Sequence, residues 1–264
     1  MNIKIIVASH KPYEMPSDTI YVPLQVGAAG KTGFGFERDD TGENISEKNP
    51  YYCELTGLYW AWKNLEAEYI GLAHYRRHFC GKCKSSNKME RVIRGVEVEG
   101  LLQKAKVIVP QKRKYYIESL YSHYAHTHYG EHLELVNEIV SKQCPEYLQA
   151  YRNVLQQTEG YMFNMMIMEK SLLNQYCQWL FPILGELEAQ VNLDDLSDFQ
   201  KRLFGRVSEI LLNVWLAYQL ETKNILPKEL CEVPYIHMEK TNWFKKGTSF
   251  LKAKFFGNKY DKSF

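Results

Sequence analysis

The sequence predicts an α/β fold, because short β-branched runs alternate with segments of helical periodicity along most of its 264 residues. The first strand is expected at 3–8 and the next at 20–26, each followed by a polar or glycine-rich turn. With 45% hydrophobic residues, no internal repeat and no linker, the chain can bury one sizeable core. We therefore expect a single domain over residues 1–238 and a separate tail over 239–264.

A helix with clear boundary signals is expected after the second turn. Asn49 is the expected N-cap, Pro50 suits the first helical position, and apolar residues at helical spacing extend the helix over 51–64. A short apolar run at 69–73 then predicts a buried strand. A later helix is expected to kink or break near Pro182. The remaining elements are helices at 96–104, 117–124, 131–142, 145–157, 171–188 and 199–220, and strands at 106–110 and 162–168.

The strand at 69–73 ends in the motif His74-Tyr75-Arg76-Arg77. In α/β proteins, ligands bind at the carboxyl ends of strands. Two adjacent arginines at such an end offer a fork of donors suited to a diphosphate or a carboxylate. The alternative is a strand cap whose arginines pair with surface carboxylates.

Composition narrows the class of protein. The formal charge of +2 gives no basic platform for nucleic acid, and 19 tyrosines suit sugar-binding surfaces or interfaces. We expect a cytoplasmic, reduced protein, since no secretory signal or apolar run long enough to span a bilayer is visible. Cys80 and Cys83 have CxxC spacing, but no second such pair follows to complete a metal site.

Several well-known motifs are absent. The glycines of 27–33 have the wrong spacing for a dinucleotide fingerprint, and Gly30-Lys31-Thr32 lacks the first glycine of a phosphate-binding loop. His128 and His132 would lie one helical turn apart, as in a metal pair, but no clear third ligand accompanies them. Packed or solvated histidines are the preferred interpretation.

A series of longer motifs runs in a fixed order along about residues 1–220. They are 10–13, 23–28, 39–46, 48–49, 53–64, 71–77, 164–168, 176–181, and Arg202 with Gly205, Ser208 and Glu209. On these motifs the chain resembles a family of bacterial glycosyltransferases of capsular and exopolysaccharide biosynthesis, a family that includes galactofuranosyltransferases. The motifs are long and ordered, so the likeness is more specific than a shared α/β pattern.

The resemblance implies a single-domain, GT-A-like nucleotide-sugar transferase sandwich with a helical C-terminal part. It implies transfer of a hexose, such as galactofuranose or galactose, from a UDP-sugar to a lipid-linked saccharide in surface polysaccharide synthesis. The alternative from another class is a non-catalytic module that binds a nucleotide-sugar or a glycan within an assembly complex. The residues expected to bind the donor are His10, Lys11, Gln25, Val26, Gly27, Asn44, Ser46, Asn49, His74, Tyr75, Arg76, Arg77, Asn164 and Arg202.

GT-A enzymes usually hold the diphosphate with Mn²⁺ or Mg²⁺ on an Asp-x-Asp that follows a central strand. Here the strand at 69–73 ends in cationic residues instead. Arginine and histidine can neutralise a leaving UDP as a metal would, so we expect no metal cofactor. Asp39-Asp40 or Asp194-Asp195 would supply the ligands if a metal were used.

An inverting transferase needs a carboxylate that takes the proton of the acceptor hydroxyl. Glu209 and Glu54 are the candidates, because both lie in predicted helices, away from the polar surface that a solvated glutamate would occupy. The alternative is that either glutamate pairs with a buried arginine such as Arg202 or Arg76.

The tail differs in composition from the rest of the chain. From Trp243 to Phe264, large apolar side chains interleave with lysines, and Asp261 is the only acidic residue. This pattern is typical of a segment that lies on anionic lipid. We therefore expect a peripheral protein on the inner face of the cell membrane; a disordered tail is the alternative.

Overall fold

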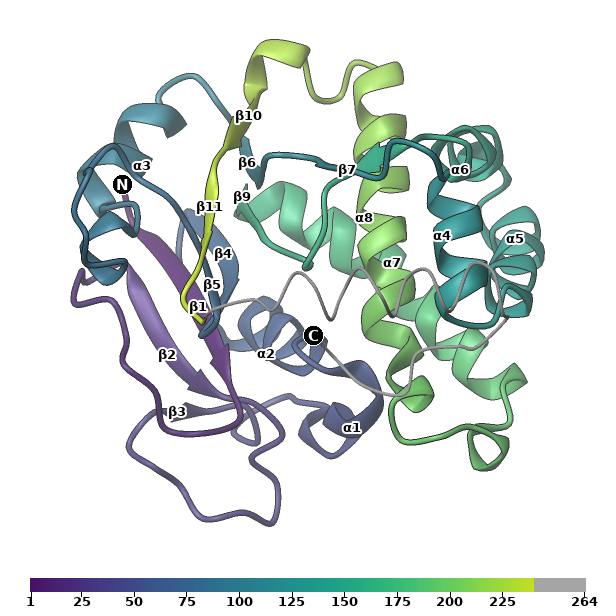
Figure 1. Cartoon of the computed structure of the whole chain (residues 1–264), viewed down its shortest axis with the longest axis horizontal. Helices are drawn as coiled ribbons and strands as arrows, with labels where there is room; N and C mark the ends of the chain where they lie inside the picture. Colours follow the sequence, from purple (N-terminus) through teal and green to yellow (C-terminus); the bar gives the residue numbers. More distant parts are fainter. Residues whose placement is uncertain (240–264) are drawn as a thin grey trace.

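A computed structural model describes residues 1–239 and places a mixed sheet at the centre of this part of the chain (Figure 1). The sheet order is β10-β6-β9-β4-β1-β2-β3, and β5 and β11 pair with each other beside β4. A separate two-stranded pair, β7 and β8, lies apart from this sheet. The strands are β1 Ile3–Ser9, β2 Tyr21–Gln25, β3 Glu37–Arg38, β4 Tyr69–His74, β5 Arg77–Phe79, β6 Val107–Pro110, β7 Arg113–Lys114, β8 Glu159–Gly160, β9 Met166–Glu169, β10 Leu230–Val233 and β11 Tyr235–His237.

The directions of the strands decide which residues meet at one edge of the sheet. β1 is parallel to both β2 and β4, with Ala8 opposite His74, so the carboxyl ends of β1 and β4 lie together. β9 runs antiparallel to β4, with Met166 opposite Leu72. The residues that precede β9 are therefore brought to the same edge as the residues that follow β1 and β4.

Both faces of the sheet are buried. Along β1, Ile6 and Ala8 belong to a large core shared with the helices, whereas Ile5 and Val7 belong to a second core on the opposite face. This alternation is the two-residue period of a strand. The near-continuous apolar sequence of β1 follows from burial on both sides.

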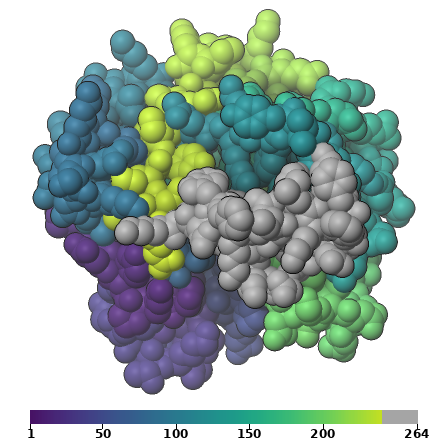
Figure 2. Space-filling model, viewed as in Figure 1, coloured from purple at the N-terminus to yellow at the C-terminus, as the bar shows by residue number. Residues whose placement is uncertain are grey.

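The helices are α1 Asn49–Tyr52, α2 Leu55–Asn64, α3 Gly95–Leu102, α4 Leu120–Thr127, α5 Glu131–Gln143, α6 Leu148–Leu155, α7 Lys170–Gln190 and α8 Leu203–Glu221. Helices α4 to α8 lie together, and Figure 2 shows their teal and green residues on the side away from the purple N-terminal residues. Helix α3 instead packs on the opposite face of the sheet, where Val98 and Leu102 belong to the second core. Short 3₁₀ helices lie at Ser46–Lys48, Met89–Arg91, Pro145–Tyr147, Leu193–Asp195, Gln200–Arg202 and Pro227–Glu229.

Two expected elements are interrupted at left-handed residues. The helix expected over 51–64 is divided at Cys53, whose φ is +53°, so Glu54 becomes the N-cap residue of α2. The strand expected over 162–168 begins only at Met166, because Phe163 and Asn164 have φ values of +73° and +53°. Both interruptions place backbone in the sparsely populated left-handed region, where non-glycine residues need support from their surroundings.

Other expectations differ from the structure in detail. Helix α7 continues through Pro182, so the expected break is absent, whereas the expected kink stays a prediction. The strands β10 and β11 were not predicted, although they complete one edge of the sheet and cover β5. The tail expected over 239–264 lies outside the described residues except for Glu239. Within residues 1–239 no helix combines the length and the apolar character needed to cross a membrane.

Candidate functional site

A cavity of about 490 Å³ opens at the carboxyl edge of the sheet, where the strands face α4 and α8. Its sheet side is formed by residues after β1 and β4 and by the turn that divides α1 from α2. Its helical side comes from α4, α8, the segment that includes β7, and the segment between β8 and β9. The polar and charged residues among its lining are His10, Asn49, Glu54, His74, Tyr75, Arg76, Arg77, Arg113, Tyr115, His123, Tyr124, Thr127, His128, Arg202, Arg206 and Glu209.

The hairpin of β4 and β5 places the two arginines of the predicted motif at the cavity. His74 at the end of β4 pairs with Arg77 at the start of β5, and β5 in turn pairs with β11. The chain therefore reverses at Tyr75 and Arg76, directly beside the residues that follow β1. His10 contacts the Tyr75 ring edge-on, with 5.3 Å between ring centroids.

Arg77 is a largely buried cation that has no hydrogen-bond or ion-pair partner among residues 1–239. No hydrogen bond or ion pair joins its side chain to another residue of 1–239, and its buried Nε has no acceptor there. Its guanidinium lies 4.4 Å from the centroid of the Phe163 ring. Burial and the neighbouring Arg76 charge lower the pKa of Arg77. A buried, unpaired guanidinium is costly, so this arrangement is typical of a group that awaits an anionic ligand.

Two more arginines reach the cavity from the start of α8. Arg202 Nε donates to Cys53 Sγ at 3.2 Å, and burial raises the pKa of the Cys53 thiol to about 11. Arg206 donates to the Phe199 carbonyl at 2.7 Å, and burial lowers the pKa of Arg206 to about 10. Together with Arg76, Arg77 and Arg113, they line the cavity with five guanidinium groups, against two carboxyl groups.

The two candidate carboxyl groups occupy different environments. Burial, and then the Glu54 charge, raise the pKa of Glu209 to about 7. Glu54 accepts a hydrogen bond from Asn164 Nδ2 at 2.7 Å, and His74 Nε2 lies 3.8 Å from the same oxygen. Neither glutamate forms an ion pair with an arginine among the described residues. Glu209 is thus a carboxyl group poised to exchange a proton near neutral pH.

The left-handed residues before β9 hold this arrangement in place. Asn164 is fully buried; besides Glu54 it donates to the Gly205 carbonyl at 2.9 Å and accepts from Ser208 Oγ at 2.9 Å. The Phe163 carbonyl lies 2.9 Å from His74 Nε2. Because a carbonyl can only accept, His74 carries a proton on Nε2. Burial lowers the pKa of His74, which favours the neutral ring.

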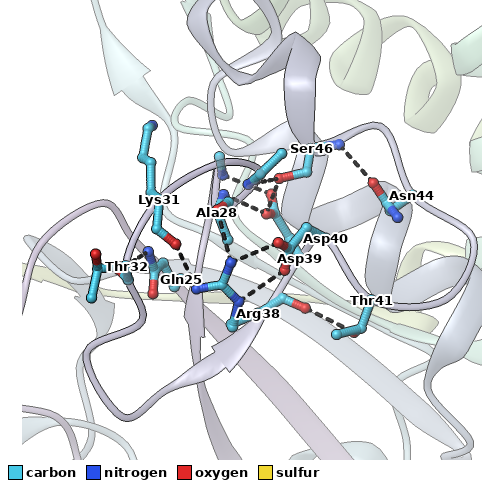
Figure 3. Close-up of polar contacts among 12 residues, drawn as sticks. Gln25, Ala28, Lys31, Thr32, Arg38, Asp39, Asp40, Thr41, Asn44 and Ser46 are labelled. Carbon is cyan, nitrogen blue, oxygen red and sulfur yellow. Dashed lines mark hydrogen bonds and ion pairs between the residues drawn. The ribbon is translucent and has the colours of Figure 1, made fainter.

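A second cluster of polar residues lies beside the cavity and is self-contained (Figure 3). The buried carboxylate of Asp39 accepts hydrogen bonds from the backbone amides of Gly27 and Ala28, at 2.8 and 3.0 Å. It also accepts from the hydroxyl groups of Ser46 and Thr56. Gly27 has a φ of +61°, and an added Cβ would meet the Asn49 side chain at 2.4 Å. The Asp39 cluster therefore fixes the glycine-rich loop against the start of α1.

The structure separates the residues predicted to bind a donor into two groups. His10, Val26, Asn49, His74, Tyr75, Arg76, Arg77 and Arg202 line the cavity, together with Glu54 and Glu209. Lys11, Gln25, Gly27, Asn44, Ser46 and Asn164 do not line it. Gly27, Asn44 and Ser46 belong to the Asp39 cluster or its loop. Asn164 donates a hydrogen bond to Glu54 but does not itself line the cavity.

The acidic pairs that the sequence offered for a metal do not fit one at this cavity. The Asp39 oxygens are occupied by four donors, and Asp40 pairs with Arg38 at 2.6 Å. Asp194 and Asp195 lie in the 3₁₀ helix after α7 and do not line the cavity. Within the described part of the chain, no three histidine, cysteine or carboxylate side chains are grouped to hold a metal ion.

Comparison with known families places this geometry in context. Residues 4–220 match the model of a family described as "Domain of unknown function (DUF4422)". The chain belongs to the DUF4422 family. All of the cavity-lining residues named above fall within the matched region.

A solved structure shares the fold of this DUF4422 chain. It is the apo structure of WbbM, a bifunctional glycosyltransferase, with a TM-score of 0.82 and 29% sequence identity. The match covers 91% of this chain but 46% of WbbM, so this chain spans a little under half of that protein. The GT-A-like fold class expected from the sequence is confirmed by this likeness. No curated protein compared with the chain matches it significantly.

Several lining residues of the DUF4422 chain were not singled out from its sequence. Arg113 follows β6 in a basic run, and Arg206 lies one turn beyond Arg202 on the same face of α8. His123 and His128 were interpreted as packed or solvated histidines, but both line the cavity. The i, i+4 spacing of Arg202 and Arg206 was the available signal, because it places two cations on one helix face.

Proposed function

We propose that this chain is a glycosyltransferase that moves a hexose, such as galactofuranose or galactose, from a UDP-sugar to a lipid-linked saccharide. The observation that supports it most is Arg77, a largely buried guanidinium that no acceptor or carboxylate of residues 1–239 pairs with, at the edge of a GT-A-like sheet. Glycosyltransferase activity in WbbM, which shares this fold, supports the same class of reaction.

The donor diphosphate would lie between the sheet edge and α8. Arg76 and Arg77 belong to the β4–β5 hairpin, and Arg202 lies at the start of α8. Guanidinium groups can chelate phosphate oxygens in pairs and remain charged when buried. They would neutralise the negative charge that develops on UDP as the bond between the anomeric carbon and the diphosphate oxygen breaks. No step of this mechanism needs a metal ion.

Glu209 is the proposed general base of an inverting transfer. Its carboxylate would take the proton of the acceptor hydroxyl as that oxygen attacks the anomeric carbon. A base works best when its pKa lies near the operating pH, and the pKa of Glu209 is raised to about 7. Glu54 is the second candidate, and its Oε1 is already engaged by Asn164.

Attachment to the membrane is the second part of the proposal. A lipid-linked acceptor lies at a bilayer surface, and the segment beyond Glu239 carries the lysines and aromatic residues described above. We expect residues 240–264 to contribute attachment to anionic lipid that weakens with salt, on the inner face of the cell membrane.

Release of UDP tests this proposal directly. The full chain should release UDP from one UDP-hexose, faster when a saccharide acceptor is present, and EDTA should leave the rate largely unchanged. Donor binding without UDP release would instead support the non-catalytic binding module. Complete loss of activity with EDTA, restored by Mn²⁺, would show that a metal takes the role assigned to the arginines.

A further inference from the structure

The turn at residues 115–118 exposes apolar side chains beside the cavity. Tyr116 is 81% exposed and Ile117 is 72% exposed, and they are adjacent in sequence. Single exposed apolar residues are ordinary, but two large ones together at a loop tip need an explanation.

The backbone of this turn is strained where the exposure is greatest. The amide of Ile117 donates to the Tyr115 carbonyl at 2.7 Å, which closes a three-residue turn around Tyr116. Tyr116 has a φ of +60°, a left-handed conformation that is unfavourable for an aromatic residue. Strain of this kind persists only where the surroundings enforce it, and it is common at functional sites.

Contacts on both sides of the turn hold it in this form. The amides of Tyr115 and Leu120 donate to the carbonyls of Thr158 and Gln157, each at 2.8 Å. Glu118, nearly fully buried, lies 3.0 Å from His123 and 2.6 Å from His126. The residues on both sides of Tyr116 and Ile117 are therefore held in place by hydrogen bonds, while these two side chains project outward.

The surroundings of the turn are basic. Lys112, Arg113 and Lys114 precede it directly, and Lys114 is exposed. Two acidic groups lie nearby: Glu159, opposite Lys114 in the β7–β8 pair, is 3.3 Å from Lys112, and the buried Glu118 faces His123 and His126. The segment 112–117 thus combines an excess of positive charge with two projecting apolar side chains, the pairing that complements an anionic lipid surface.

We propose that the segment 112–117 inserts Tyr116 and Ile117, from the tip of the turn, into the interface of an anionic bilayer. The same segment contributes Arg113 and Tyr115 to the cavity lining. A bilayer bound at this turn would therefore lie at the mouth of the cavity, within reach of a lipid-linked acceptor. The proposal concerns residues 112–117 alone, and only the reach to a lipid-linked acceptor rests on the proposed transfer.

The test compares two variants of the full chain. Tyr116→Asn with Ile117→Ser removes the apolar tip, and asparagine tolerates the left-handed backbone. Val96→Ser is the matched control, because Val96 is 73% exposed on α3, away from the cavity, between Arg94, Glu97 and Glu99. Sedimentation with vesicles of phosphatidylcholine and phosphatidylglycerol, at high salt, should show about tenfold weaker binding for the double variant and no change for Val96→Ser.

Hydrogen exchange supplies a readout that does not depend on the variants. Vesicles should slow exchange of the amides in 114–118 of the wild-type chain. UDP release with a short water-soluble acceptor should be equal in wild type and double variant. Vesicle binding is measured separately from UDP release, so it still tests this proposal if the chain proves not to be a transferase. Wild-type vesicle binding by the double variant, or unchanged exchange at 114–118, would overturn the proposal; the latter is also the result expected if the turn seats a protein partner.

Discussion

Two clusters of buried charge lie side by side in this molecule, and they are built in opposite ways. The Asp39 cluster surrounds one carboxylate with four hydrogen-bond donors from three separate segments. In the cavity cluster, Arg77 has no hydrogen-bond or ion-pair partner within the described part of the chain, and burial raises the pKa of Glu209 to about 7. A charge that the protein satisfies itself stabilises the fold, whereas a charge left unsatisfied beside a cavity is available to a ligand.

The same comparison explains why the resemblance to a family could not separate the two clusters. Both contain charged and polar residues from the matched motifs, and both lie near the carboxyl edge of the sheet. Only the hydrogen-bond partners distinguish Asp39 and Ser46, which support a loop, from Arg77 and Glu209, which face the cavity.

The largest expected effect comes from breaking the satisfied cluster. Asp39→Ala leaves two buried backbone amides and two hydroxyl groups without their acceptor. Each unsatisfied amide costs about 1–3 kcal/mol, so the free energy of unfolding should fall on the order of 4 kcal/mol. Urea unfolding followed by circular dichroism measures it. Asp39→Asn keeps one acceptor oxygen and should lose less; equal stability of all three proteins would refute the structural role of this cluster.

A large effect on transfer, rather than on stability, is expected in the cavity cluster. Glu209→Gln keeps the shape of the side chain but removes the proton acceptor, so transfer should fall about 10²–10⁴-fold with little change in donor affinity. Steady-state UDP release and donor titration measure the two quantities. Glu54→Gln serves as the companion variant. If Glu209→Gln retains activity and Glu54→Gln loses it, the base is Glu54.

A smaller effect concerns pH. The folded-state pKa of Glu209 lies above its ordinary value of 4.5, so the stability tied to its neutral form is fully present below about 4.5 and is lost as pH rises through about 7. The loss should be at most about 3 kcal/mol, because the carboxyl group retains some exposure to the cavity. Activity should rise over the same range, since the base must be ionised. In Glu209→Gln, neither the fall in stability nor the rise in activity should occur over this pH range. A fall in stability that persists in the variant would assign the titration to another group.

The sequence was sufficient for the sheet side of the cavity but not for its supports. The apolar run at 69–73 followed by His74-Tyr75-Arg76-Arg77 correctly located a strand end, because alternating burial and strand direction are local properties. The roles of Cys53 and Asn164 depend on left-handed backbone that no pattern announces. Asn164 meets Glu54 only because β9 runs antiparallel to β4, and that pairing joins segments far apart in the chain.

The contacts on the helical side of the cavity also depend on segments that are far apart in the chain. Arg206 and His128 meet at 3.2 Å across the join between α4 and α8, although they are far apart in sequence. The sequence predicted α4 and α8 to within a few residues. It did not predict that these two helices pack together, because helical periodicity identifies the buried face of a helix but not the element that covers it.

Arg77→Met provides the most direct test of the central claim, that this buried cation serves a ligand and not the fold. Thermal melts of wild type and variant, each with and without a saturating UDP-sugar or UDP, measure two quantities. These are the melting temperature without ligand and the increase in that temperature when ligand binds. Without ligand, the variant should melt at or above the wild-type temperature, because methionine fills the site without an unpaired charge. With ligand, the wild type should be stabilised and the variant much less so, since one charge-assisted contact worth about 1.5–3 kcal/mol is lost. A variant that is strongly destabilised alone yet keeps the full ligand-induced shift would contradict the account.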